Sequence, residues 1–434
     1  MASGMNGFFV AERVMEMQAS LRGLRGTVRV PFVALLLAAG LLAGEQAKVV
    51  AASGDAPQAT PSLLAFGPSP ATIVCLGDSV TGVYYHTGGR RAYPEMLEIA
   101  IRMAVPQAQV RVINAGISGH TTVQGLARLD RDVLQHKPAL VTISFGLNDV
   151  VRVPEEQFVA NLAALVARCR EAKSQVVLCT PNAVITTSSR PVEKVSRYCD
   201  KIRELGRTLN VPVCDQFAAG ESLRAKDAWT WRLTMSDEIH PNMDGHKRMA
   251  QELCHTITGR EVCLAKVGPP QDFLAKTREL LKQGKPVKVL AMPPWDAVVA
   301  SVLKQFHPQA VVEITPWPTD GKSLAELERA AQQLVRATKP DLVVLAVPAD
   351  AAATIDEEFA RSYSWIMNWS LSFGHQEWDC VVVHPSVVAP DINVPRGDLI
   401  RQLVRAQDLT LIDRPAGDRS PAEVLFGNIL KQSP

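Results

Sequence analysis

The sequence predicts a three-layer α/β/α fold, in which helices cover both faces of a parallel sheet. Short apolar runs alternate with amphipathic stretches from residue 71 onward, and glycines and polar residues cluster directly after several of these runs. The same alternation begins again near residue 286. Regular alternation of strand and helix is typical of parallel sheets, whose strands are buried on both faces and therefore apolar throughout.

The first region contains five predicted strands, each followed by a predicted helix. The apolar runs indicate strands over residues 72–76, 110–113, 140–143, 175–179 and 211–214. Stretches with apolar residues at helical spacing indicate helices over residues 93–103, 123–135, 154–172, 192–209 and 245–256. In such a sheet we expect a functional site at the carboxyl ends of the strands.

The second region repeats this pattern, with strands predicted over residues 287–290, 310–314, 342–345, 380–383 and 409–412. Residues 119–148 align without gaps on residues 321–350, including Lys137-Pro-Ala-Leu-Val-Thr-Ile on Lys339-Pro-Asp-Leu-Val-Val-Leu. Segments 179–182 and 383–386 are also similar, as are 213–215 and 411–413. We infer a degenerate internal repeat.

The N-terminus has the layout of a signal peptide. An apolar run over residues 30–44 follows three arginines and precedes Val50-Ala51-Ala52. The run is shorter than the roughly 20 apolar residues that a membrane span needs. We therefore expect export to the periplasm or the extracellular space, with an uncleaved N-terminal membrane anchor as the alternative. The predicted organisation is a signal peptide or anchor at 1–52, a linker at 53–70, a catalytic domain at 71–260, a connector at 261–285 and a second domain at 286–434.

Composition argues against several classes of partner. The 434 residues include 46 Lys and Arg and 44 Asp and Glu. Cleavage after Ala52 would remove five basic and three acidic residues, leaving 41 of each sign and no net charge. We therefore expect no nucleic-acid partner. The eight cysteines lack metal-type spacing, so no metal site is expected. Composition does not indicate an oligomeric state.

Two motifs about 160 residues apart carry the parts of a serine hydrolase. Ser79 follows the first predicted strand, within Gly77-Asp78-Ser79-Val80. Asp237 and His240 are three residues apart, so that one turn can aim the carboxylate at the imidazole. A serine hydroxyl needs such a base to become a nucleophile. Each motif alone also fits an ordinary turn or an incidental loop histidine.

Two further segments supply candidate oxyanion donors. Residues 114–119 follow the second predicted strand, and their glycines would allow the Gly119 N–H to approach a ligand. Residues 146–149 follow the third predicted strand and offer the Asn148 amide. Each preorganised donor of this kind contributes ~3 kcal/mol to transition-state stabilisation.

These four blocks, in this order, resemble the SGNH (GDSL-type) hydrolases over about residues 71–258. The run over residues 112–129 is particularly similar to the exported bacterial thioesterase and lysophospholipase branch. The resemblance implies a flavodoxin-like sheet and hydrolysis without a cofactor. It also implies that Ser79 is the nucleophile, His240 the base and Asp237 its orienting acid. The N–H groups of Ser79 and Gly119 and the Asn148 side chain would form the oxyanion hole.

The second region departs from this pattern, and we expect it to be catalytically inactive. Residues 290–295 replace the nucleophile block with Leu-Ala-Met-Pro-Pro-Trp, and Asp350 stands where the first region has Asn148. No Asp-x-x-His-Pro turn follows Asp413. Two tryptophans on one helical face, Trp365 and Trp369, fit either carbohydrate binding or core packing, and packing is the more frequent role for such a stripe.

The sequence predicts a serine ester hydrolase whose substrate is a small-molecule or glycan ester. O-acetylated glycans, short acyl esters, lysophospholipids and thioesters all remain open, with acetylated glycan favoured. Trp229 and Trp231 are candidate sugar-stacking residues, and Arg90 is a candidate anion-binding residue. The alternatives are an O-acyltransferase that uses the same triad, and a glycan-binding protein without activity.

Overall fold

The computed structural model describes residues 63–64, 70–351, 353, 355–371, 373–374, 377–389 and 394–432. The predicted signal peptide and nearly all of the predicted linker lie outside these residues. Residues Gln58–Pro434 form one compact unit by their contacts, and it contains both sheets. No helix among the described residues has the length and apolarity needed to cross a membrane.

The first module, residues 70–260, is built on a parallel sheet in the order β2-β1-β3-β4-β5. Its strands are β1 (Ala71–Gly77), β2 (Val110–Gly116), β3 (Leu140–Ser144), β4 (Gln175–Cys179) and β5 (Val213–Cys214). This is the flavodoxin-like order, in which the order of the strands reverses at β1 and β3, and ligands of such sheets usually bind at the carboxyl ends of these two strands. The predicted fold class is confirmed.

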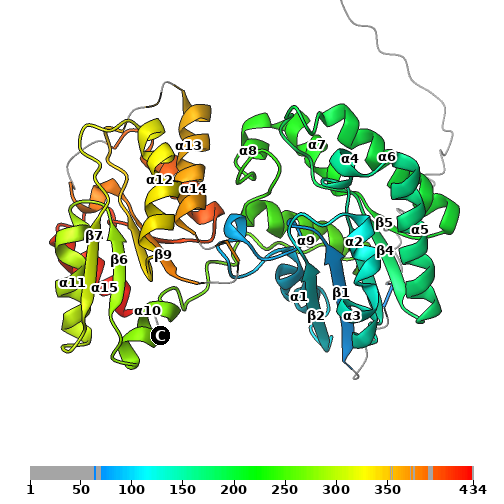
Figure 1. The fold of residues 1–434 in the computed structure, drawn as a ribbon, viewed down its shortest axis with the longest axis horizontal. Coiled ribbons are helices and arrows are strands. Elements are labelled where there is room, and N and C mark those ends of the chain that lie inside the picture. The colour runs from blue at the N-terminus through cyan, green and yellow to red at the C-terminus, as the bar shows by residue number, and fades with distance from the viewer. Residues whose placement is uncertain are drawn as a thin grey trace, which may run out of the picture. The chain divides into compact units, whose positions relative to one another are not determined.

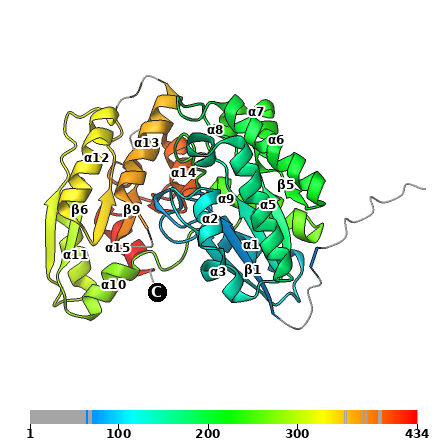
Figure 2. The same cartoon turned by 45° about the vertical axis from the view of Figure 1, so that its right-hand side comes forward.

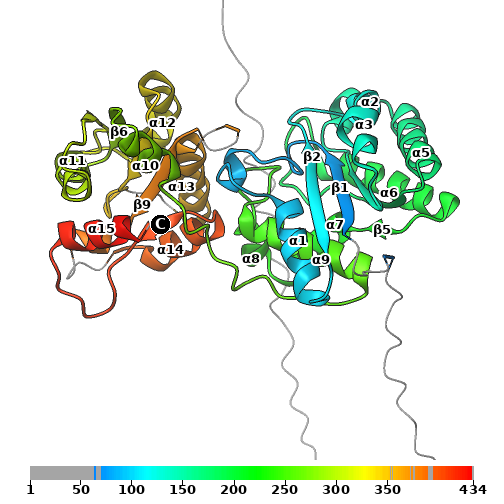
Figure 3. The same ribbon diagram turned by 90° about the horizontal axis from the view of Figure 1, so that it is seen from below.

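Helices cover both faces of this sheet. Figure 3 shows α1 (Tyr93–Ala104) and α9 (Met243–Thr258) on one face, with α2 (Thr122–Ala127), α3 (Leu129–Asp132) and α5 (Glu155–Glu171) on the other. The remaining helices are η1 (Tyr85–Thr87), η2 (Leu134–His136), α4 (Asp149–Arg152), α6 (Val192–Leu209), α7 (Gln216–Lys226) and α8 (Ala228–Arg232). All five residues of β3 are buried, as expected for a strand between two helical layers.

The helix predicted over residues 123–135 is wrong as a single element, because the structure divides it into α2, α3 and η2. The break falls at Arg128, whose backbone leaves helical geometry. Its buried guanidinium donates to the carbonyls of Gly77 at 2.8 Å and Ala115 at 2.7 Å. The arginine thus donates to carbonyls at the ends of both β1 and β2, and this position of its side chain coincides with the break in the helix.

The second module, residues 286–432, has the same strand connectivity as the first. Its sheet order is β7-β6-β8-β9-β10, with every neighbouring pair parallel. The strands are β6 (Val287–Ala291), β7 (Val312–Pro316), β8 (Leu342–Leu345), β9 (Asp379–Val383) and β10 (Thr410–Ile412). Each sheet therefore lies inside one of the two predicted domains.

Two apolar clusters fill the space on either side of the second sheet. One packs against α12 (Leu324–Thr338), α13 (Asp356–Ser370) and α14 (Gly397–Ala406), and the other against α10 (Ala275–Lys282), α11 (Trp295–Phe306) and α15 (Ala422–Lys431). Helices α12 and α13 lie side by side in Figures 1 and 2. One further turn, η3 (Pro385–Val387), follows β9.

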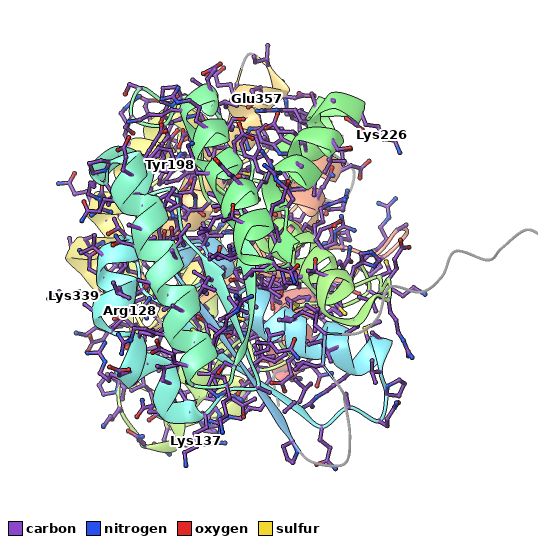
Figure 4. The ribbon with its side chains drawn as sticks, turned by 90° about the vertical axis from the view of Figure 1, so that its right-hand side faces the viewer. Arg128, Lys137, Tyr198, Lys226, Lys339 and Glu357 are labelled. Carbon is purple, nitrogen blue, oxygen red and sulfur yellow. The ribbon has the colours of Figure 1, made fainter. Side chains whose placement is uncertain are left out.

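The repeat extends to individual residues. Lys137 and Lys339, both labelled in Figure 4, precede β3 and β8. Both adopt the left-handed conformation, with φ of 49° and 47°. Arg203 forms an ion pair with Asp215 after β5, and Arg401 forms the corresponding pair with Asp413 after β10. Matching strand order, turn conformation and ion pair support the internal repeat that the sequence indicates.

Candidate active site

Three neighbouring strands bring the predicted site segments to one edge of the first sheet. β1 lies between β2 and β3, and Gly77 at its end is in register with Gly116 and with Ser144. Ser79, Gly119 and Asn148 follow these positions by two to four residues. The site therefore lies at the point where the strand order reverses, the usual ligand position in such sheets.

A close approach of the backbone shapes the nucleophile turn. A Cβ atom on Gly77 would lie 2.0 Å from Thr81 Oγ1 and 2.7 Å from the Ser144 carbonyl oxygen, so only glycine fits there. The Asp78 Oδ1 atom accepts a hydrogen bond from the Val80 N–H at 3.0 Å. Burial raises the pKa of Asp78 to about 6, although the Val80 hydrogen bond opposes this shift. Ser79, next in the chain, stays partly accessible.

A short antiparallel bridge between Met235 and Pro241 closes the turn that carries Asp237 and His240. Within it, the Ser236 N–H donates to the His240 carbonyl at 2.9 Å. The side chain of Asn242 then caps α9 by accepting from the Gly245 N–H at 3.2 Å. The turn and the helix cap together fix the direction of the imidazole.

Ser79, His240 and Asp237 are joined in a chain of hydrogen bonds. Ser79 Oγ lies 2.9 Å from His240 Nε2, and His240 Nδ1 lies 2.8 Å from Asp237 Oδ2. Asp237 Oδ1 also accepts from the N–H groups of Ile239 and His240. Burial pushes the pKa of Asp237 upward, but attraction to His240 and these hydrogen bonds outweigh burial and hold it well below the usual value. The carboxylate is thus ionised beside a histidine that contacts a hydroxyl, the arrangement that activates a serine.

Tyr85 is a member of this site that the sequence did not reveal. Its hydroxyl donates to Asp237 Oδ2 at 2.8 Å and lies 3.4 Å from His240 Nδ1. Burial, followed by the charge of Asp237, raises the pKa of Tyr85, so the group remains a hydrogen-bond donor. Tyr85 belongs to η1, in a loop whose fold depends on tertiary contacts, and the sequence carries no signal that pairs it with a residue 152 positions away.

Two buried histidines stack behind His240. The ring of His86 lies 4.4 Å from that of His240 at an interplanar angle of 9°, and His246 lies 5.6 Å beyond His86. Burial, then the neighbouring imidazoles, lowers the pKa of His86, and burial likewise lowers the pKa of His246 to about 3. Both are therefore neutral near pH 7, and they provide a flat wall that limits rotation of the His240 ring.

Residues 114–116 of the first predicted oxyanion segment lie within β2 and residues 117–119 follow it, whereas the second segment, residues 146–149, follows β3. Gly119 has a φ of 75°, a backbone conformation that residues other than glycine rarely adopt. The Asn148 amide is oriented from both ends, because its Nδ2 donates to the His120 carbonyl at 3.0 Å and its Oδ1 accepts from Arg190 at 3.3 Å. Arg190 also donates to the Leu147 carbonyl at 2.7 Å. It is a second supporting residue that the sequence did not identify.

Residues of the second module form hydrogen bonds to the turn that carries Asp237 and His240. Asn368 and Ser236 exchange two hydrogen bonds, at 2.9 Å between their side chains and at 3.1 Å from the Asn368 amide to the Ser236 carbonyl. The Gln407 amide donates to Ser236 Oγ at 3.2 Å and to Asn368 Oδ1 at 3.1 Å. All three side chains are buried, and Ser236 directly precedes Asp237. The second module therefore contacts the backbone turn that positions the acid.

The three predicted substrate-binding residues differ in their exposure and in the contacts that they already make. Trp231 is only 6% exposed and Arg224 lies over its ring, so this indole is not available to stack on a sugar. Trp229, in α8, is 37% exposed. Arg90 donates to the carbonyls of Asp272 at 2.9 Å and Phe273 at 3.0 Å, so it ties the connector to the first module. The expectation for Trp231 is corrected accordingly, and those for Arg90 and Trp229 stay predictions.

The second module contains another group of Ser, His and Asp side chains, but their bonds differ. His384 Nε2 lies 3.2 Å from the Gly397 carbonyl, and its Nδ1 accepts from the Ser386 backbone N–H at 3.2 Å. Ser386 Oγ, at 2.7 Å, and Asp413 Oδ1, at 3.4 Å, both lie on the Nδ1 side of the ring. A triad needs the hydroxyl and the carboxylate on opposite nitrogens, so this histidine serves as a structural cap of η3.

The remaining site positions of the second module also lack catalytic groups. Trp295, in the segment that replaces the nucleophile block, is fully buried and stacks on Phe426 at 4.5 Å. Among the described residues, no cluster of three or more His, Cys, Asp or Glu side chains is arranged to hold a metal ion.

Comparison with known proteins locates similarity in the first module. A family model described as the GDSL-like Lipase/Acylhydrolase family matches residues 75–248. An acetylxylan esterase from Geobacillus stearothermophilus is 27% identical over 172 residues, which are 36% of this chain and 76% of that protein. Thioesterase 1/protease 1/lysophospholipase L1 from Escherichia coli (strain K12) is 30% identical over 180 residues, 41% of this chain and 79% of that protein. Among solved structures, that of the acetylxylan esterase Axe2 from Geobacillus stearothermophilus covers 43% of this chain and 94% of its own, with 25% identity and a TM-score of 0.37.

Proposed function

Since this chain belongs to the GDSL-like lipase/acylhydrolase family and is a carboxylic ester hydrolase, we propose that it cleaves its ester through an acyl-enzyme formed on Ser79. One observation carries the proposal: Ser79 Oγ and Asp237 Oδ2 lie 2.9 and 2.8 Å from opposite nitrogens of His240. Asp237 thereby favours the tautomer whose Nε2 accepts the hydroxyl proton.

In the first half-reaction, Ser79 Oγ attacks the ester carbonyl while His240 Nε2 takes its proton. The carbonyl oxygen becomes an oxyanion, which the N–H groups of Ser79 and Gly119 and the Asn148 amide would stabilise. His240 then returns the proton to the departing alkoxide oxygen, so that the ester C–O bond breaks and an alcohol leaves. A water that loses a proton to His240 releases the acid and restores Ser79 in the second half-reaction.

We propose an O-acetylated glycan as the substrate and export as the destination. The substrate rests on similarity to an acetylxylan esterase at 27% identity, and on the aromatic residues that flank the site. Export rests on the charged, apolar and small-residue pattern of residues 1–52, which lie outside the described part of the chain. Secretion of a reporter fused after residue 52, compared with the same reporter without this leader, tests the second proposal.

Comparison of the protein with its Ser79→Ala variant tests the acyl-enzyme. Hydrolysis of p-nitrophenyl acetate should fall at least about 10³-fold, because removal of the nucleophile leaves only binding and oxyanion stabilisation. A fluorophosphonate should label the parent protein at Ser79 and leave the variant unlabelled. Equal rates for the two proteins would exclude Ser79 as the nucleophile. A parent protein that hydrolyses no ester would refute the proposed activity as a whole.

A further inference from the structure

Five aromatic side chains from the two modules gather beside the triad. Tyr84 and Tyr85 come from the loop after the nucleophile block, Trp365 and Trp369 from α13, and Phe373 from the segment after it. Trp365 lies 5.5 Å from Trp369 and 6.5 Å from Tyr85, with an interplanar angle of 27° in both pairs. Phe373 lies 5.5 Å from Tyr84 and 6.1 Å from Tyr85. The rings form a nearly continuous group that begins at the site itself.

A pocket of about 330 Å³ opens among these rings. Tyr85, Trp365, Trp369 and Phe373 contribute aromatic surface to it, while Gln332 and Arg336 on α12 contribute polar groups. Both tryptophans are partly exposed, and Phe373, Gln332 and Arg336 are exposed. Flat aromatic faces beside amide and guanidinium donors suit a sugar ring, whose C–H faces stack while its hydroxyl groups accept hydrogen bonds.

The position of the pocket relative to the triad is fixed by two contacts. Tyr85 lines the pocket with its ring, and its hydroxyl donates to Asp237. On the other side, α13 carries Trp365 and Trp369 together with Asn368, and Asn368 is bonded to Ser236 directly before Asp237. One helix thus both holds the acid turn and supplies the aromatic wall.

This location indicates which part of an ester would occupy the pocket. The alcohol must leave beside His240, because His240 Nε2 gives it the proton, whereas the carbonyl oxygen faces the oxyanion donors. The pocket is connected to the site through Tyr85, whose ring meets that of His240 edge-on at 5.9 Å. The pocket therefore lies beside His240 and Asp237, and neither Gly119 nor Asn148 lines it, so the alcohol portion of the ester, rather than the carbonyl oxygen, is the part assigned to it.

We propose that the second module is a part of the substrate site, and that its pocket binds a sugar unit of the glycan whose O-acetyl group is removed. A sugar ring stacks on Trp369 and Trp365, and Gln332 and Arg336 donate to its hydroxyl groups. This proposal rests on the proposed esterase function of the first module. It gives the catalytically inactive module a role that the triad alone does not require.

The test uses the full chain and two esters that differ in their alcohol portion. Trp369→Ala is the preferred variant, because Trp369 is the tryptophan that has no ring contact with Tyr85. For acetylated xylo-oligosaccharides, kcat/KM should fall about tenfold through a higher KM, since one stacking contact of ~1.4 kcal/mol is lost. For p-nitrophenyl acetate, which is too small to reach the pocket, the loss should be less than twofold.

Trp229→Ala serves as the matched comparison, because Trp229 is the exposed tryptophan that the sequence suggested for stacking. A selective loss in Trp229→Ala, and none in Trp369→Ala, would overturn the proposal. Equal losses on both esters in Trp369→Ala would also overturn it, since they would reflect damage to the fold. Binding of unacetylated xylohexaose to the Ser79→Ala protein, measured by calorimetry, should weaken with the added Trp369→Ala change. If the parent protein fails on both esters but this binding result holds, the esterase function fails and the sugar site stands.

Discussion

The two modules each bring a serine, a histidine and an aspartate to the carboxyl ends of their strands, but they bond the imidazole in different ways. In the first module the hydroxyl and the carboxylate lie on opposite nitrogens of His240. In the second they lie on the same nitrogen of His384, while the other nitrogen faces the Gly397 carbonyl. The comparison shows that residue types and proximity do not make a triad, because each imidazole nitrogen must have the right partner.

The second module nevertheless contacts the turn that carries Asp237 and His240. Asn368 and Gln407 hold Ser236, and the salt bridges of Asp408 with Arg91 and Lys247 join the modules nearby. Asp408 and Lys247 are buried, so their attraction is less screened by water than that of a surface pair. The second module thus contacts the acid turn of the first module, although its own Ser386, His384 and Asp413 are not bonded as a triad.

The largest difference should appear when each histidine is removed. His240→Ala should lower kcat for p-nitrophenyl acetate at least about 10³-fold, because the hydroxyl loses its base. His384→Ala should change kcat less than twofold, while it lowers the free energy of unfolding by about 1–3 kcal/mol, since a buried cap and its hydrogen bonds are lost. Steady-state kinetics and urea unfolding measure the two effects. A comparable loss of activity in both variants would contradict the assignment of His384 as a structural residue.

A smaller contrast should separate the residues that follow the third strand of each module. Asn148→Ala should lower kcat about 10²- to 10³-fold, as expected when one oxyanion donor is removed. Asp350, at the corresponding position of the second module, is exposed, and Asp350→Ala should leave kcat within twofold. KM should change little in either variant, because the donor acts on charge that develops in the transition state. A rise in KM at constant kcat for Asn148→Ala would indicate ground-state binding instead.

Asp78 and Asp237, both in the first module, differ in the direction of their pKa shift. Burial raises the pKa of Asp78, whereas for Asp237 the attraction to His240 and the hydrogen bonds outweigh burial and lower the pKa. The raised pKa of Asp78, about 6, means that the folded protein keeps a proton that the unfolded chain loses above its ordinary value of 3.8. Stability from this group therefore falls as pH rises from about 4 to 6, by about 3 kcal/mol in total. The Asp78→Asn variant has no titratable group at this position and therefore lacks this pH-dependent contribution to stability. Urea unfolding of both proteins between pH 4 and pH 7 should show the variant gaining that amount relative to the parent, and a constant difference would contradict the raised pKa.

The parts of the molecule that could be predicted from sequence are those encoded locally. The strands follow from apolar runs, and the hydrogen-bonded group of Ser79, Asp237 and His240 follows from two short motifs, one directly after β1 and one in the turn before α9. Tyr85 and Asn368 could not be predicted, because their partners lie 152 and 132 residues away in the chain. The break at Arg128 escaped prediction for the same reason, since its guanidinium satisfies carbonyls on two strands. Trp231 was wrongly expected to stack on a sugar, because the sequence does not distinguish an aromatic residue that faces solvent from one that is buried in the core.

The smallest expected effect tests the contact through which the second module supports the first. Asn368→Ala removes both hydrogen bonds to Ser236 and should lower kcat about tenfold, because a small displacement of the acid turn misaligns His240. Ser362→Ala is the matched control, since Ser362 is also buried on α13 but bonds to Glu328. Each change should cost about 1–2 kcal/mol of stability, but only Asn368→Ala should lower kcat. If kcat falls equally in both variants, the second module contributes stability alone, and the positional role of Asn368 is refuted.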